Sequence, residues 1–174
     1  KVRFRGGLIT EATIAPQAFN RLLADLEQRA PVLQHLRFLS IGNSHVHEAV
    51  NRLCKSKLAH RLRSLDLSGS GINSRNVKRL AQSSGLGRLT SLALAWNPIG
   101  EDGIRLLSRA GNFAHLEVLD LRGISMRRRA LRMLMEPGRL LDLRLLMISG
   151  NHDRASKRLL RELKSNLGGR LMIC

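Results

Sequence analysis

Tyrosine is absent from this sequence, and other aromatic residues are scarce: the 174 residues include one Trp and four Phe. No run of about 18 uncharged apolar residues occurs, because charged residues interrupt every leucine-rich stretch, and this excludes a membrane-spanning helix. The two cysteines, Cys54 and Cys174, are too few for a disulfide framework. Proline is also rare, with four residues, while 43% of the chain is hydrophobic, which excludes global disorder and predicts one or two folded domains.

Acidic residues are few relative to basic ones. Thirty Lys and Arg against 13 Asp and Glu give a net charge of +17, and 24 of the 30 basic residues are Arg. The excess is +9 in residues 1–87 (14 minus 5) and +8 in residues 88–174 (16 minus 8), which excludes a basic tail but not a basic surface. This composition allows an anionic partner without identifying it. The chain begins at Lys1 without a methionine or a signal-peptide apolar region, which favours a processed or trimmed piece and an intracellular location.

The sequence contains an internal repeat with the pattern L-x-x-L-x-L/I-x-x-N/S. Its copies LRFLSIGNS, LRSLDLSGS, LTSLALAWN, LEVLDLRGI and LRLLMISGN begin at Leu36, Leu62, Leu89, Leu116 and Leu143, a nearly constant period of about 27 residues. One further step of similar length reaches Leu171, where a last strand is expected. Five copies in register exceed what leucine content alone would scatter.

Each repeat predicts a strand, a turn and a helix. Leucines such as Leu65 and Leu67 alternate at period two, so they point to one face of a short strand. Apolar pairs at helical spacing follow the turns: Val50 and Leu53, Val77 and Leu80, Ile104 and Leu107, Leu131 and Leu134. Because one unit cannot bury both apolar faces, stacking predicts a parallel sheet on one side, helices on the other and leucines between them. Asn97 and Asn151 stand where a side-chain amide can satisfy backbone groups of the neighbouring turn.

This repeat resembles that of the leucine-rich repeat family, and its length and full helix are similar to the ribonuclease-inhibitor-like subclass. The stretch SLALAWNPIGEDGIRLLS, residues 91–108, is closest to the family pattern, and the resemblance covers residues 33–174. It implies an α/β leucine-rich repeat solenoid, a right-handed β-α horseshoe with a concave parallel sheet and convex helices.

The two ends of the array depart from the repeat. Residues 1–32 resemble the N-terminal caps of bacterial arrays, with a hairpin around Gly6-Gly7 and a first helix that Pro16 opens. We therefore predict a capping hairpin and helix over 1–32 and a repeat array over 33–174. Asp153 occupies an otherwise apolar slot, as in a terminal unit.

The side chains between the strand leucines are expected to face the concave wall. They are Phe38, Ser40, Gly42, Ser64, Asp66, Ser68, Ser91, Ala93, Ala95, Val118, Asp120, Arg122, Leu145, Met147 and Ser149. Because these side chains are small and mostly neutral, the wall suits close approach of another protein. We predict that Trp96, Asp66, Asp120, Arg122 and Met147 contact this partner. Trp96 has two interpretations, an anchor for the partner or a side chain that packs over the next turn.

Basic residues are expected on the convex side instead. Counting 16 positions from each frame leucine reaches Arg52, Lys78, Arg105 and Arg132, and the longer fifth unit offers Arg161. The predicted nucleic-acid-binding set adds Arg127, Arg128, Arg129 and Arg158 to this column. A phosphate backbone can follow such a column with salt-dependent affinity. The alternative is that these arginines simply solvate the outer faces of helices.

Catalytic and metal-binding patterns are not found. His45, His47, Cys54 and His60 match no standard zinc spacing, and Gly85-Leu86-Gly87 precedes a strand where a phosphate loop needs a helix. No Ser or Cys lies in a nucleophile-elbow context. We therefore predict no catalytic residue, no metal, no cofactor and no small-molecule substrate.

Two functions remain open. As the resemblance implies, the first is a non-catalytic scaffold that binds another protein with its concave face. The second is a basic component of a ribonucleoprotein or other nucleic-acid assembly, held by RNA or DNA backbone on the convex face, since the low aromatic content disfavours base stacking. Attraction to an anionic membrane would need an exposed amphipathic helix, and none is apparent.

Overall fold

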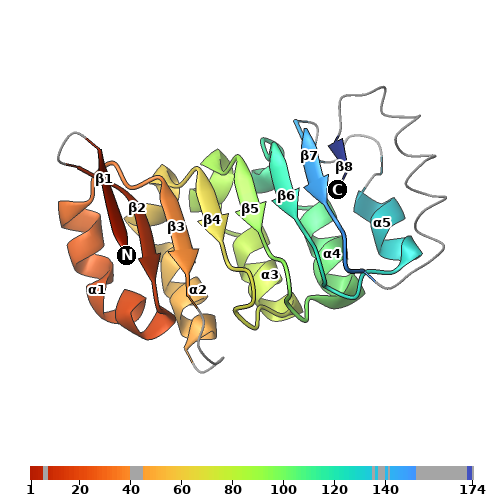
Figure 1. Ribbon diagram of the computed structural model, residues 1–174, viewed down its shortest axis with the longest axis horizontal. Helices are drawn as coiled ribbons and strands as arrows, with labels where there is room; N and C mark the ends of the chain where they lie inside the picture. The colour runs from red at the N-terminus through yellow and green to blue at the C-terminus, as the bar shows by residue number, and fades with distance from the viewer. Residues whose placement is uncertain are drawn as a thin grey trace.

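The computed structural model of the chain describes residues 1–5, 8–39, 45–134, 136, 140, 142–151 and 172–173. Eight strands form one sheet in which neighbours in the chain are neighbours in space, from β1 to β8. Figure 1 shows the helices in a row along one side of this sheet, so the molecule has a strand layer and a helix layer. None of the described helices is long and apolar enough to cross a membrane.

The elements follow the predicted order of strand, turn and helix. The strands are β1 (Val2–Arg5), β2 (Leu8–Ile14), β3 (His35–Phe38), β4 (Ser64–Asp66), β5 (Ser91–Ala93), β6 (Val118–Asp120), β7 (Leu145–Met147) and β8 (Met172–Ile173). The helices are α1 (Pro16–Arg29), α2 (Val46–Lys55), α3 (Ser74–Ala81), α4 (Gly100–Ser108) and α5 (Arg128–Leu134). Short 3-10 helices, which the repeat pattern does not predict, precede β4, β5 and β6: η1 (Lys57–Arg61), η2 (Ser84–Arg88) and η3 (Gly111–Phe113).

The N-terminal segment forms a hairpin and a helix. β1 and β2 are antiparallel, and β2 then pairs in parallel with β3, so the hairpin extends the sheet of the repeats. Pro16 opens α1, where its missing N–H costs nothing and its fixed φ suits the first turn. The division of the chain at residue 32 stays a prediction, because the sheet is continuous across it.

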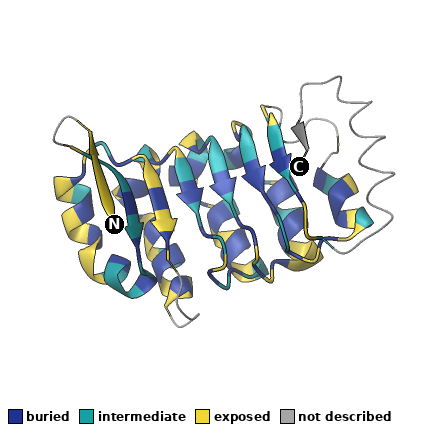
Figure 2. Cartoon of the chain, viewed as in Figure 1, coloured by how far each residue is buried: buried dark blue, intermediate teal, exposed yellow. Residues whose placement is uncertain are grey.

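The strand leucines of the central repeats lie in register, as their constant spacing predicted. Leu65 pairs with Leu92, Leu92 with Leu119, and Leu119 with Leu146 on parallel strands. All four are fully buried between the sheet and the helices. Figure 2 shows this burial alternating with partly exposed residues along the central strands. The predicted α/β class and the parallel sheet are therefore confirmed for β2 to β8.

The first repeat frame was wrong by three residues. β3 pairs Leu36 with Leu65, whereas the sequence frame aligned Leu36 with Leu62. The first frame leucine is therefore Leu33, which is fully buried. Phe38, predicted to face the concave wall, is 1% exposed, and its ring centroid lies 4.9 Å from that of Phe19 on α1. Ser40 and Gly42 of the same prediction lie outside the described residues.

Two asparagines, Asn97 buried and Asn151 half-buried, close the turns between strands and helices, as predicted. Asn97 accepts a hydrogen bond from the N–H of Ile72 and donates to the carbonyls of Leu67, Leu94 and Ala95. Asn151 makes the corresponding bonds one step along the array, accepting from Ile124 and Met126 and donating to Leu121 and Ile148. Each amide joins its own turn to that of the preceding repeat, where no strand ladder reaches.

Candidate interaction surfaces

The face of the sheet opposite the helices carries two rows of outward side chains, and we call it the open face. Parallel register aligns the first row across β3 to β7: His35, Ser64, Ser91, Val118 and Leu145. The second row is Arg37, Asp66, Ala93, Asp120 and Met147. The structure therefore brings three predicted partner contacts, Asp66, Asp120 and Met147, into one row across the sheet.

Ion pairs neutralise both carboxylates of the second row. Nε of Arg37 lies 3.1 Å from Oδ2 of Asp66. Arg122 donates to both oxygens of Asp120, at 2.9 Å from Nε and 2.7 Å from a terminal nitrogen. The Asp120 side chain is only 5% exposed and that of Arg122 is 42% exposed. Asp120 thus offers a partner little surface of its own, and it positions Arg122, whose pKa its hydrogen bond raises.

Trp96 lies where β5 leaves the sheet, beside Arg122, whose carbonyl accepts a 2.8 Å hydrogen bond from the Trp96 N–H. Its backbone is left-handed, with φ of 57°, and the equivalent positions 69, 123 and 150 of other repeats are glycines at similar positive φ. The six-membered ring of the indole covers the Cα of Gly123, where any side chain would collide with it. A Cβ on Gly150 would lie 3.1 Å from Cη2 of the same ring. The indole therefore packs over the next two turns.

Packing does not hide Trp96, because the residue is still 62% exposed. Both interpretations drawn from the sequence thus describe part of the geometry: one face of the indole lies on glycine, and much of the ring meets solvent. Among the large hydrophobic residues that the structure describes, Trp96 is the one exposed beyond residue 39. No other aromatic side chain is exposed on the described part of the central repeats.

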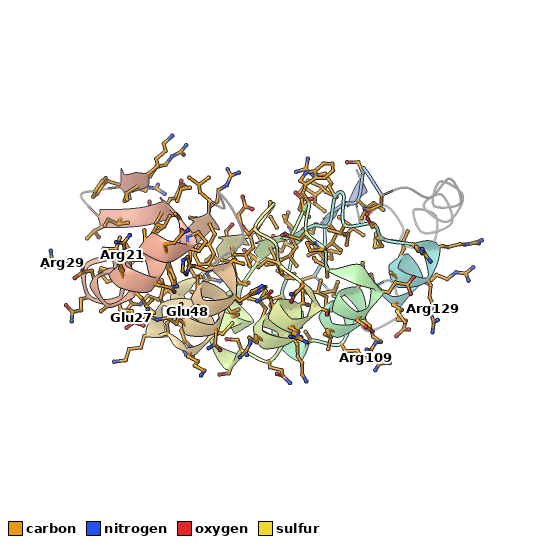
Figure 3. The ribbon with its side chains drawn as sticks, turned by 90° about the horizontal axis from the view of Figure 1, so that it is seen from below. Arg21, Glu27, Arg29, Glu48, Arg109 and Arg129 are labelled. Carbon is orange, nitrogen blue, oxygen red and sulfur yellow. The ribbon has the colours of Figure 1, made fainter. Side chains whose placement is uncertain are left out.

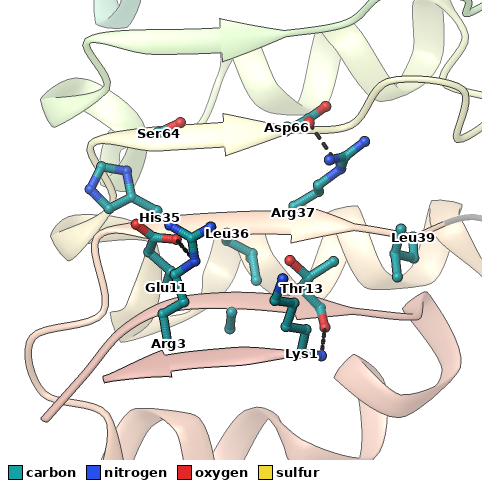
Figure 4. Close-up of a pocket in the computed structure, with 11 residues that line it drawn as sticks. Lys1, Arg3, Glu11, Thr13, His35, Leu36, Arg37, Leu39, Ser64 and Asp66 are labelled. Carbon is teal, nitrogen blue, oxygen red and sulfur yellow. Dashed lines mark hydrogen bonds and ion pairs between the residues drawn. The ribbon is translucent and has the colours of Figure 1, made fainter. Parts of the chain in front are cut away.

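A pocket of about 430 Å³ at the N-terminal end of the open face was missed by the sequence analysis. Figure 4 shows its walls: Arg3 reaches Glu11, Arg37 reaches Asp66, and the Lys1 amino group bonds to the Thr13 carbonyl. The correct frame of the first repeat would have revealed it, because only that frame turns His35 and Arg37 outward. Two of its cations, Arg3 and Arg37, are already paired with carboxylates, which lowers the attraction of the pocket for an anion.

The helix side carries the predicted cation column only in part. Lys78, Arg105 and Arg132 each follow the first residue of a buried apolar pair, one repeat length apart. Arg52 does not belong to this column, because Asn51 occupies the place after Val50. Arg52 is exposed and donates to the backbone carbonyl of Asn20 instead. The count of 16 fails here because it began from a misplaced frame and because the first repeat is longer than the next.

The basic residues predicted to bind nucleic acid differ in exposure and pairing. Arg105 is paired with Asp102 at 2.9 Å, whereas Lys78 and Arg132 are exposed. Arg127 and Arg129 are exposed and Arg128 is half-buried, and Figure 3 shows Arg109 and Arg129 on the helix side, away from the strands. Arg158 and Arg161 lie outside the described residues.

The histidine, cysteine and glycine residues that the sequence analysis tested for metal binding or catalysis make structural contacts. Within the described ranges, no group of three or more His, Cys, Asp or Glu could hold a metal ion. His47 bonds through Nδ1 to Asn76, and burial raises the pKa of the Cys54 thiol to about 11, which leaves it protonated at neutral pH. Gly85 has a packing role, since a Cβ there would lie 2.8 Å from that of Ala59 on η1.

Comparison with known proteins agrees with this architecture. A family model described as a leucine-rich repeat matches residues 89–108, which hold β5, the Trp96 turn and α4. This match supports a leucine-rich repeat protein. Such repeats generally bind proteins, and the match suggests a non-catalytic interaction domain. No curated protein matches the chain.

Proposed function

We propose that this leucine-rich repeat chain is a non-catalytic scaffold that binds another protein with the open face of its sheet, the concave face of a solenoid. Trp96 is the observation that carries the proposal. The other repeats have glycine at the equivalent positions 69, 123 and 150, whereas position 96 has tryptophan in the same left-handed backbone conformation. A left-handed backbone costs an L-residue roughly 1–2 kcal/mol, and such strain gathers at functional sites.

The surroundings of Trp96 fit a binding anchor. Its ring rests on the two glycine turns, so it is already ordered before a partner arrives, and binding costs little further side-chain entropy. Arg122, whose carbonyl accepts the Trp96 N–H, has its guanidinium fixed by Asp120. Across the sheet, Met147 offers a half-buried apolar contact and Asp66 a half-exposed carboxylate. An aromatic anchor with adjacent polar groups is the usual composition of an interface hot spot.

Trp96→Gly is expected to reduce partner capture strongly while the chain stays folded. The removed anchor should weaken binding by about 30-fold or more, the effect of roughly 2 kcal/mol at a hot spot. Quantitative affinity purification with the wild type, Trp96→Gly and Arg109→Ala tests this, because Arg109 is exposed on the helix side, away from the open face. Partners retained by Trp96→Gly as well as by Arg109→Ala would contradict the proposal.

The same residue provides a direct readout, since Trp96 is the only tryptophan. A purified partner should shift its fluorescence to shorter wavelength and protect it from a soluble quencher, because docking buries the exposed part of the indole. Binding that leaves both signals unchanged would place the interface away from Trp96.

A second function, association with RNA or DNA backbone, is favoured by the charge of α3 and α5. The charged residues described in these helices are all cations: Arg75, Lys78, Arg79, Arg128, Arg129 and Arg132. Arg75 with Arg79 and Arg128 with Arg132 place like charges four residues apart, and cations in the first turn oppose the helix dipole. A bound polyanion would offset both costs.

Replacing Arg127, Arg128, Arg129 and Arg132 with alanine tests this second function. Titration of structured RNA and duplex DNA at several salt concentrations should show weaker binding and a smaller salt slope, by about 0.9 for each lost phosphate contact on duplex DNA. Trp96→Gly should bind nucleic acid as the wild type does. No binding by the wild type at low salt would eliminate the second function.

A further inference from the structure

The outer edge of β1 pairs with no strand of the described residues. In the part of the chain that the structure describes, β1 is the first strand of the sheet and pairs only with β2. All four of its residues are exposed, and Figure 2 shows it as an exposed strand at one end of the molecule. Unpaired edges accept an additional strand unless something protects them.

The backbone of β1 is set up to pair outward. Lys1 exchanges two hydrogen bonds with Thr13, of 2.9 Å from its amino group and 2.7 Å to its carbonyl. In an antiparallel pair, the residue after such a bonded pair turns its N–H and C=O away from the partner strand. Val2 therefore presents both groups to the free side.

The side chains of β1 alternate in character. Val2 lies opposite the buried Ala12, and Phe4 opposite Ile9, which packs on the core, so both point to the helix side. Val2 is nevertheless 42% exposed and Phe4 66% exposed, because no strand covers the edge. Arg3 lies opposite Glu11 on the open face, and alternation places Arg5 on that face too.

The helix α1 carries a further exposed apolar residue. Leu22 is 43% exposed and lies about 200° around the helix from Asn20, at 100° per residue. Asn20 and Glu27, seven residues apart, bond to α2 and to the η1 segment, so Leu22 faces away from the repeats. Val2, Phe4 and Leu22 are thus three exposed apolar residues of the N-terminal elements.

The charge of this edge distinguishes between two possible partners, a second copy of the chain and a segment of another protein. A second copy paired antiparallel through a two-fold axis would bring the cations of one Lys1–Arg5 segment against those of the other, on two chains of +17 each. The segment Lys1–Arg5 has three cations and no acidic residue; Arg3 is already paired with Glu11, whereas Lys1 and Arg5 form no ion pair with the described residues. A strand with acidic side chains toward the open face and apolar ones toward Val2 and Phe4 complements it on both sides.

We propose that β1 binds an extended segment of another protein, with alternating acidic and apolar residues, as an added strand of the sheet. Main-chain hydrogen bonds to Val2 would provide affinity, and the alternating side chains would provide specificity. This interaction goes beyond the proposed function, since it uses the sheet edge rather than the open face and Trp96.

The test uses a labelled peptide of alternating Glu and Val and measures its binding by fluorescence anisotropy. Val2→Pro removes an outward N–H without breaking a bond to β2, so it should weaken binding by about ten-fold. Arg5→Glu should lose the Glu–Val peptide and gain a Lys–Val peptide, which separates edge recognition from misfolding. Trp96→Gly, the matched control away from the edge, should bind as the wild type does.

A control peptide of the same composition, with all Glu before all Val, keeps the charge and removes the alternation. It should bind at least about ten-fold more weakly than the alternating peptide. Equal binding of the two peptides, or unchanged binding by Val2→Pro, would reduce the interaction to charge attraction and overturn the proposal. A wild-type dimer by light scattering that Val2→Pro converts to a monomer would overturn it in favour of a second copy.

Discussion

Phe38→Ala is expected to lower the free energy of unfolding by about 3–5 kcal/mol, the usual cost of removing a buried phenylalanine ring. Phe38 is 1% exposed and packs against Phe19, so the substitution leaves a cavity between β3 and α1. Urea unfolding followed by circular dichroism measures this loss. The sequence frame that starts at Leu36 placed the same ring on the open wall, where its removal would cost little.

Arg37→Ala provides the matched control for this prediction. Arg37 precedes Phe38 on the same strand but points to the open face, and its pair with Asp66 has a half-exposed geometry, so its removal should cost less than about 1 kcal/mol. Similar losses in the two variants would mean that β3 does not alternate as described.

Asn97→Ala is expected to lower the free energy of unfolding by about 2–4 kcal/mol. The amide is 2% exposed and makes four hydrogen bonds. Two of its partners keep another bond, since Leu67 accepts from Ser70 and Ala95 accepts from Gly69. The cost therefore comes mainly from the N–H of Ile72 and the carbonyl of Leu94, which would be buried without a partner. Urea unfolding again provides the measurement.

Ser70→Ala is the control for Asn97→Ala, since Ser70 occupies the equivalent place one repeat earlier. Its hydroxyl makes a single long hydrogen bond, 3.4 Å to the Ser68 carbonyl, so its removal should cost less than about 1 kcal/mol. Equal stability of Asn97→Ala and the wild type would show that the turns do not depend on the amide.

The central repeats could be predicted because their period is constant. From Leu62 onward the frame leucines are equally spaced, so each leucine meets its counterpart on the next strand, and each pair such as Val77 and Leu80 meets the next helix pair. Asn97 could be predicted for the same reason, since its place in the turn has one set of backbone groups within reach. Local pattern and packing agree there.

The first repeat could not be predicted from leucine spacing alone. Leu33, Leu36 and Leu39 are three residues apart, so two frames fit the same letters. The regular interval favoured Leu36, but the first repeat is longer, since Leu33 lies further from Leu62 than Leu62 does from Leu89. Pairing with β2 decides the frame, because it buries Leu36 beside Ala12 and Phe38 beside Ile14.

The sequence predicted which residues of the candidate site face outward, but it did not predict which of their side chains contact one another. The wall residues of β4 to β7 face outward as the period of two requires. The Asp120–Arg122 pair depends on side-chain geometry that no spacing specifies, and it leaves Asp120 nearly inaccessible. For Trp96, the sequence could not tell that the ring lies on Gly123 while remaining exposed.

The stability of Trp96→Gly tests the central claim most directly, namely that this tryptophan serves binding rather than folding. Removing the covered part of the indole costs about 2 kcal/mol at most, and relieving the left-handed backbone returns roughly 1–2 kcal/mol. Urea unfolding should therefore place Trp96→Gly within about 1 kcal/mol of the wild type and above Trp96→Ala, which keeps the strain. A loss larger than the covered part of the indole can explain, or equal stability of the two variants, would make Trp96 a structural residue and contradict the account.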